Sequence, residues 1–119
     1  MNPKAKELQA RLRTFLTRVS ALCESLPRSL TAQRIAPQLI DAAGSASSNY
    51  NGACRARSRR EFAAKIGVAL EEASEALEWL ESLKEANIGS PESRDALIDE
   101  ANELTAILTA SHKTVTRNR

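Results

Sequence analysis

The chain has 119 residues, enough for one domain with a modest core, and 42% of them are apolar although only 3% are aromatic. No segment approaches the ~20 consecutive apolar residues that a membrane-spanning helix needs, and the N-terminus is too polar for a signal peptide, so we expect a soluble, cytoplasmic protein. The net charge is +2, but the charges are unevenly divided. Residues 1–65 carry twelve Lys/Arg and four Asp/Glu, whereas residues 66–119 carry five Lys/Arg and eleven Asp/Glu. This division suits binding to an acidic partner, to a nucleic acid or to a second copy of the chain.

Two amphipathic helices are predicted in the first half. Apolar residues at steps of three and four indicate a helix over about residues 4–26, and Pro27 ends it because the residue before a proline avoids helical geometry. The second helix is predicted over about 31–54, with Thr31 as its N-cap. Pro37 either lies in its first turn or kinks its start.

The third and fourth helices have clearer start signals. Ser58 and Glu61 have the spacing of a capping box, which predicts a helix over about 58–87 with Gly89 as its stop and Asn87 just before it. Its apolar face is expected to be Phe62, Ile66, Ala69, Leu70, Ala73, Leu77 and Leu80. Ser90 and Pro91 begin a fourth helix over about 91–113, after which the polar tail is expected to fray.

Short connections place successive helices antiparallel to one another. The predicted fold is therefore an all-α, up-down-up-down four-helix bundle in a single domain over residues 1–119. No strand is predicted.

Residues suited to catalysis are scarce, and we do not expect an enzyme. The single histidine, His112, lies near the end of the last predicted helix, and no phosphate-binding loop or zinc-ligand spacing is present. The many glutamates of the third helix lack the Glu-x-x-His pairs of a di-iron bundle, so no metal or cofactor is predicted. Cys23 and Cys54 are expected to be free, structural thiols.

A basic run at the junction of the second and third helices is the first candidate site. It consists of Arg55, Arg57, Arg59 and Arg60, with Lys65 one turn later. Guanidinium groups bind phosphates in a two-pronged manner, and such contacts give nucleic-acid binding that is independent of sequence. No aromatic residue is interleaved for base stacking, and the alternative is a basic loop that only keeps the domain soluble.

A second stripe lies on the third helix, away from the centre of its apolar face. Val68, Glu72, Glu75 and Trp79 follow steps of four, three and four, roughly 100–140° from that centre at 100° per residue. Tryptophan is a favoured anchor of protein interfaces, so we predict an oligomer interface here. The alternative is that Trp79 merely covers the edge of the core.

The order and spacing of several short segments resemble a known family over about residues 8–112. These segments are Pro27-Arg28-Ser29, Gln38-Leu39-Ile40, Ser45 with Asn49, Ser58-Arg59-Arg60-Glu61-Phe62, Ala69-Leu70-Glu71-Glu72-Ala73-Ser74-Glu75 and Trp79-Leu80. They resemble the four-helix-bundle proteins encoded in intervening sequences of bacterial 23S ribosomal RNA genes. The resemblance implies a homopentamer without known catalytic activity and suggests nucleic-acid binding. The accessory proteins of diversity-generating retroelements are similar in fold, and they engage RNA and a reverse transcriptase.

The resemblance also implies how three polar residues are arranged. Ser45 and Asn49 would face Glu75 of the third helix, and we interpret the three as a polar network inside a subunit or between subunits. The family pattern Asn-x-x-Glu-Gly is altered, because the run from Asn49 to Gly52 lacks the acidic residue.

Two functions follow as hypotheses. The first is a non-enzymatic homo-oligomer that binds RNA or DNA non-specifically. The second is a protein-interaction or assembly module, such as a reverse-transcriptase accessory protein, in which the two oppositely charged halves serve self-assembly or docking.

Overall fold

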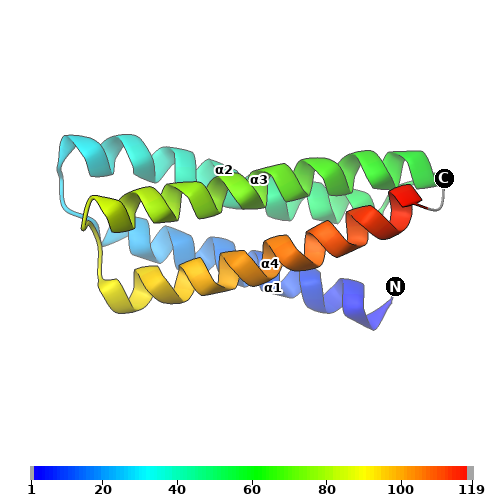
Figure 1. Cartoon of the computed structure of the whole chain (residues 1–119), viewed down its shortest axis with the longest axis horizontal. Helices are drawn as coiled ribbons and strands as arrows, with labels where there is room; N and C mark the ends of the chain where they lie inside the picture. The colour runs from blue at the N-terminus through cyan, green and yellow to red at the C-terminus, as the bar shows by residue number, and fades with distance from the viewer. Residues whose placement is uncertain (1, 118–119) are drawn as a thin grey trace.

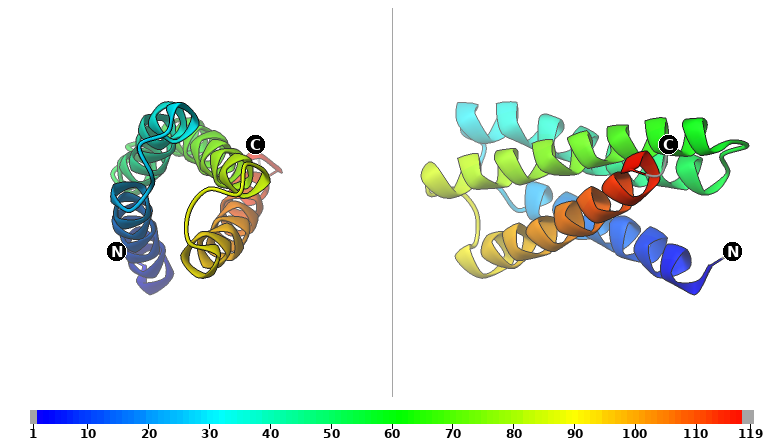
Figure 2. Two further views of the ribbon diagram at one scale, coloured as in Figure 1. Left: turned by 90° about the vertical axis from the view of Figure 1, so that its left-hand side faces the viewer. Right: turned by 45° about the vertical axis from the view of Figure 1, so that its right-hand side comes forward.

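The computed structural model describes residues 2–117, which form four α-helices and no strand. The helices are α1 (Pro3–Glu24), α2 (Leu30–Cys54), α3 (Arg59–Glu85) and α4 (Pro91–Arg117). Each runs in the opposite direction to the helix before it (Figure 1). Viewed from one end, the helices follow one another round the bundle in chain order (Figure 2). The predicted all-α four-helix bundle is therefore confirmed.

The core is built mainly of leucine and alanine, and the helix pairs differ in how tightly they pack. α2 and α3 have the most extensive contact, whereas α1 and α4 have the least. Alanines are buried on both members of the tight pair, including Ala42 and Ala46 on α2 and Ala69 and Ala73 on α3. Small side chains let two helix backbones approach closely. Leucines such as Leu12, Leu39 and Leu104 fill the space between the other pairs.

Serine side chains set two helix ends that the sequence analysis placed elsewhere. Ser29, not Thr31, caps α2, since its hydroxyl accepts a hydrogen bond from the Ala32 amide at 3.1 Å. At the end of α1 the Ser25 hydroxyl donates to the Leu22 carbonyl at 2.6 Å, so the helix ends at Glu24, before Pro27 can act.

Pro37 lies well inside α2 and on its exposed side. A proline removes the hydrogen bond to the carbonyl four residues earlier, here that of Gln33. Gln33 is also exposed, so solvent can hydrate this carbonyl. This location explains how α2 continues through the proline.

The two ends of α3 show one confirmed signal and one difference from the prediction. The Ser58 hydroxyl accepts from the Glu61 amide at 3.0 Å, as predicted, although the Glu61 carboxylate accepts from the Arg57 amide rather than from that of Ser58. α3 ends at Glu85, two residues before the predicted end, and of the two stop residues that the sequence offers it is Asn87, not Gly89, that takes the left-handed backbone directly after the helix, with φ of 57°. The amides of Asn87 and Ile88 donate to the carbonyls of Lys84 and Leu83, which forms a Schellman end.

The fourth helix begins at Pro91 as predicted but extends further than expected. It is helical to Arg117, so the predicted fraying from Lys113 is wrong. Val115 is buried and gives the last turns an apolar contact that the polar sequence around it conceals. At the other end Arg94 is only 5% exposed and donates to the Ile88 carbonyl at 3.3 Å, which ties α4 to the preceding loop.

The core face of α3 is rotated relative to the prediction. Its buried residues are Ala63, Ile66, Ala69, Ala73, Ala76, Leu80 and Leu83. Phe62, Leu70 and Leu77 are only partly buried at the margin of the core. Because α3 makes its tightest contact with α2, its alanines take the centre and its larger side chains lie at the edge.

Candidate nucleic-acid interface

The predicted basic run lies at the connection between α2 and α3. Arg55 is the C-cap of α2, Arg57 lies in the loop, and Arg59 and Arg60 are the first two residues of α3. All four side chains are exposed. Lys65 is half-buried, and its aliphatic stem lies against Gly52 of α2.

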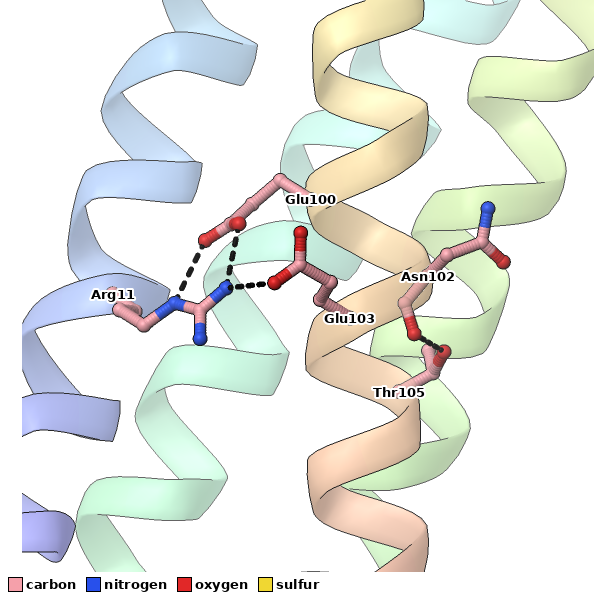
Figure 3. Close-up of polar contacts among 5 residues, drawn as sticks. All are labelled: Arg11, Glu100, Asn102, Glu103 and Thr105. Carbon is pink, nitrogen blue, oxygen red and sulfur yellow. Dashed lines mark hydrogen bonds and ion pairs between the residues drawn. The ribbon is translucent and has the colours of Figure 1, made fainter.

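None of these five cations forms an ion pair with any residue between 2 and 117. The nearest acidic residue in sequence, Glu61, instead uses a carboxylate oxygen to accept from the Arg57 amide at 2.8 Å. In contrast, Arg11 on α1 is already paired with Glu100 and Glu103 of α4 (Figure 3). The charges of the basic run are therefore available to a ligand.

The topology adds cations that the sequence analysis missed. The start of α1, the α2–α3 connection and the end of α4 lie at the same end of the molecule (Figure 1). We call this the basic end, and its exposed cations are Lys4, Lys6, Arg55, Arg57, Arg59, Arg60, Lys113 and Arg117. The lysines of α1 were missed because they are far from the arginine run in sequence. Lys113 and Arg117 were missed because the chain was expected to fray from Lys113 onward.

Helix dipoles add little net potential to the basic end, because the N-termini of α1 and α3 lie there beside the C-termini of α2 and α4. The first turn of α1 contains no acidic residue. Lys4, Arg59 and Arg60 occupy first turns, where a cation opposes the dipole at a cost of about 0.3–1 kcal/mol each. No acidic side chain of the described residues forms an ion pair with any of these three cations. A bound anion could therefore neutralise their charges.

The predicted oligomer stripe lies along the side of α3. Val68 is 39% exposed, a high value for a large apolar side chain, and Trp79 is partly buried. The Trp79 indole N–H points to a Glu75 carboxylate oxygen at 3.4 Å. Burial raises the pKa of Glu72, and the neighbouring charges of Glu75 and Glu71 raise it further. The stripe therefore combines an apolar anchor with carboxylates that lack a cation.

The predicted polar network is divided into two pairs within the described chain. The Asn49 side-chain amide donates to the Ser45 carbonyl at 2.9 Å and to the Ser45 hydroxyl at 3.1 Å. Glu75 has its hydrogen bond with Trp79 instead. Asn49 folds back onto its own helix because a residue four positions earlier is the nearest acceptor. A network within one subunit is therefore not formed, and a network between subunits stays a prediction.

Comparison with known proteins assigns the family. The model of the 23S rRNA-intervening sequence protein family matches residues 6–110. The chain belongs to this family. The chain is also similar to a crystal structure from Bacteroides thetaiotaomicron, described as a protein with unknown function from the S23 ribosomal protein family. The TM-score is 0.80 at 25% sequence identity, over 92% of this chain and 98% of the other.

No curated protein matches the sequence. The resemblance to the 23S rRNA-intervening sequence family, predicted from short motifs, is confirmed. The region matched to this family includes the whole α2–α3 connection, whereas Lys4, Lys113 and Arg117 of the basic end lie outside it.

The remaining chemistry of this family member is sparse. Cys23 and Cys54 are free and half-buried, and burial raises the pKa of Cys23 to about 11. Within residues 2–117 no cluster of three or more His, Cys, Asp or Glu side chains has the arrangement of a metal site. No helix of the described part is long and apolar enough to span a membrane.

Proposed function

We propose that the chain is a non-enzymatic homo-oligomer that binds RNA or DNA without sequence preference through its basic end. The observation that carries this proposal is the gathering of unpaired cations from three separate segments at one end of the bundle. The positive potential of this end comes from these side chains, because two helix N-termini and two helix C-termini lie there and their dipoles offset one another.

The expected contacts are with phosphates. Arginine offers a planar pair of N–H donors that matches two phosphate oxygens. The aromatic residues Phe15, Tyr50 and Phe62 are wholly or partly buried, which leaves no stacking platform for bases near the arginines. Binding should therefore be blind to sequence and should weaken steeply with salt.

Assembly would multiply these contacts. In a cyclic oligomer every subunit presents its basic end on the same rim. Once one subunit has bound the nucleic acid, the neighbouring basic ends are held close to it, so each further contact forms at a raised effective concentration. The family resemblance supports a pentamer. The acidic residues of α3 and α4 would repel the same ligand and confine it to the rim.

The test is a fluorescence anisotropy titration with RNA and DNA of one length at two salt concentrations. The test variant is Arg57→Ala with Arg59→Ala and Arg60→Ala. The matched control removes three exposed arginines elsewhere, Arg18, Arg28 and Arg34. We expect binding by the parent and the control at low salt, and at least a tenfold weaker affinity in the test variant. No binding by the parent, or equal affinities for test variant and control, would contradict the proposal.

A second function is favoured by one feature, a groove of about 490 Å³ between α1 and α4. Leu8, Tyr50, Phe62 and Ile107 form its apolar floor, where the two helices have the least contact. Such a floor suits an apolar segment of a partner protein, as in an assembly module or reverse-transcriptase accessory protein. An oligomer that binds no nucleic acid at low salt would favour this function.

A further inference from the structure

A second groove, of about 260 Å³, follows the outer side of the α1–α2 pair. Small residues form its middle, namely Gly44, Ser47 and Ser48 of α2. Arg13 of α1 and Arg55 at the end of α2 border it. Both arginines are exposed, and neither forms an ion pair within residues 2–117.

Gly44 has no role in the packing of a single subunit. A Cβ added there would meet only Leu16 Cδ1, at the ordinary contact distance of 3.9 Å. Glycine in a helix interior costs about 1 kcal/mol relative to alanine. The isolated subunit would therefore be more stable with alanine, and the glycine leaves room for something that approaches α2 from outside.

Ser47 contributes a small side chain to the groove. It is only 7% exposed and lines the groove beside Gly44. No buried side-chain nitrogen or oxygen of the described residues lacks a hydrogen-bond partner, so Ser47 matters here through its small size.

The surface that complements this groove is on the same chain. The outer side of α3 is a shallow hollow lined by Glu71, Glu75, Glu78 and Trp79. Its carboxylates have no cationic partner within residues 2–117. Burial is the main cause of the raised pKa of Glu72, and a cation placed beside these carboxylates would relieve the further rise that Glu75 and Glu71 cause.

We propose that the acidic outer side of α3 of one copy docks into the α1–α2 groove of the next copy. In this interface the α3 glutamates pair with Arg13 and Arg55, and α3 lies across the α2 backbone at Gly44. The proposal rests on the oligomer in the proposed function and specifies its interface. Its two surfaces differ, so the contact is heterologous.

The two surfaces lie on different parts of the same chain, because α2 separates α1 from α3 round the bundle (Figure 2). Each copy can therefore contact one neighbour through its α1–α2 groove and another through α3. Such a heterologous contact builds a ring when the rotation between successive copies closes, and a filament when it does not. Arg55 then belongs to the interface, and the other cations of the basic end remain for nucleic acid.

Charge reversal tests the pairing of the two surfaces. One variant carries Glu75→Arg and Glu78→Arg, and the other carries Arg13→Glu and Arg55→Glu. Light scattering should show that each falls to a single subunit of 13.0 kDa. The variant with all four substitutions restores complementarity and should regain the parent mass. The control, Glu92→Arg with Asp99→Arg, changes two exposed acids of α4 and should assemble like the parent.

A steric variant gives a second measure that does not depend on charge. Gly44→Leu places a bulky side chain in the groove. Because a Cβ at this position meets only Leu16 Cδ1, at 3.9 Å, the variant should keep parental helicity by circular dichroism and yet be monomeric. Full assembly of this variant would overturn the inference. The same holds if the four-substitution variant stays monomeric, or if both charge-reversed variants assemble. A monomeric parent would instead remove the oligomer of the proposed function, and Arg57, Arg59 and Arg60 can still be tested for nucleic-acid binding.

Discussion

Arg11 of α1 holds Glu100 of α4 through a two-pronged ion pair (Figure 3). The Arg11 Nε atom donates to Glu100 Oε2 at 3.1 Å, and a terminal guanidinium nitrogen donates to Glu100 Oε1 at 2.7 Å. The same nitrogen reaches Glu103 at 3.3 Å. The hydrogen bond to Glu100 is the largest cause of the raised pKa of Arg11. This pair matters because α1 and α4 are the neighbouring helices with the least contact.

The first prediction concerns this ion pair. Arg11→Ala should lower the free energy of unfolding by about 1 kcal/mol, because a two-pronged, partly buried pair is stronger than an ordinary surface pair. Urea denaturation at one fixed protein concentration measures the loss, which should shrink at high salt. The exposed Arg18→Ala serves as control and should change stability by less than about 0.5 kcal/mol. Equal losses in the two variants would refute a special role for Arg11.

The second prediction concerns the end of α3. Asn87 has a φ of 57°, a conformation that glycine adopts with less strain, so Asn87→Gly should stabilise the protein by about 0.5–1 kcal/mol. Thermal or urea denaturation measures the gain. Asn102→Gly, in an exposed part of α4, should do the opposite, because glycine weakens a helix interior. A loss of stability in Asn87→Gly would show that the side chain itself is needed.

The third prediction concerns thiol reactivity. Burial raises the pKa of Cys23 to about 11 from 9.0, so the reactive thiolate is about 100-fold scarcer near pH 8. In a Cys54→Ser background, labelling of the native protein should be slow and should still accelerate above pH 10. Urea-unfolded protein is the control and should react at the rate of an ordinary thiol. A labelling rate that levels off near pH 9, or a native disulfide in the parent, would contradict the prediction.

The fourth prediction concerns alkaline pH. Burial raises the pKa of Tyr50 to about 12 as well as that of Cys23 to about 11. Both groups lose protons more readily in the unfolded chain, so their stabilising contribution is complete below pH 9 and is lost as the pH rises toward 12. The free energy of unfolding should therefore be lower at pH 10.5 than at pH 8. The fall should be smaller in Cys23→Ser, and an identical fall would show that other groups cause it.

Features that depend on a few neighbouring residues, such as helix starts, could be predicted from the sequence. Contacts between residues that are far apart in sequence could not. The starts of α3 and α4 follow from Ser58 and Pro91, since a cap and a first-turn proline act within a few residues. Ser29 was passed over for Thr31 because both are capping residues, and only the hydrogen bond to Ala32 decides between them. The shared side of Val68, Glu72, Glu75 and Trp79 could be predicted because all four lie on one helix, and its role as an interface stays a prediction. The division of the polar network could not be predicted, because it depends on which acceptor the Asn49 amide meets in space.

The α1–α2 groove was hidden for a related reason. Gly44 looks ordinary in a helix sequence, and its significance comes from the folded chain, which places only Leu16 near the position that a Cβ would take. Similarly, the place of Lys4 and Lys6 at the same end as the arginine run depends on the antiparallel order of the helices, and that of Lys113 and Arg117 depends on the extent of α4.

The last prediction uses the end of α4 to test whether the basic end acts as one surface. Lys113 and Arg117 are more than 50 positions from the arginine run in sequence, yet they lie at the same end of the bundle. If both contact phosphates, Lys113→Ala with Arg117→Ala should weaken binding of RNA and DNA alike. For a DNA duplex short enough to meet one subunit, each lost phosphate contact should flatten the plot of log K against log salt by about 0.9.

The double variant should therefore flatten the slope by nearly twice that amount. The matched control is Arg28→Ala with Arg34→Ala, which removes the same charge from exposed positions on and before α2, away from the basic end. A global change in net charge would affect the affinity of both variants equally, whereas direct contacts change the slope only in the first. If the slope of the first variant equals that of the parent, the ligand does not reach α4, and the nucleic-acid surface is limited to the α2–α3 connection.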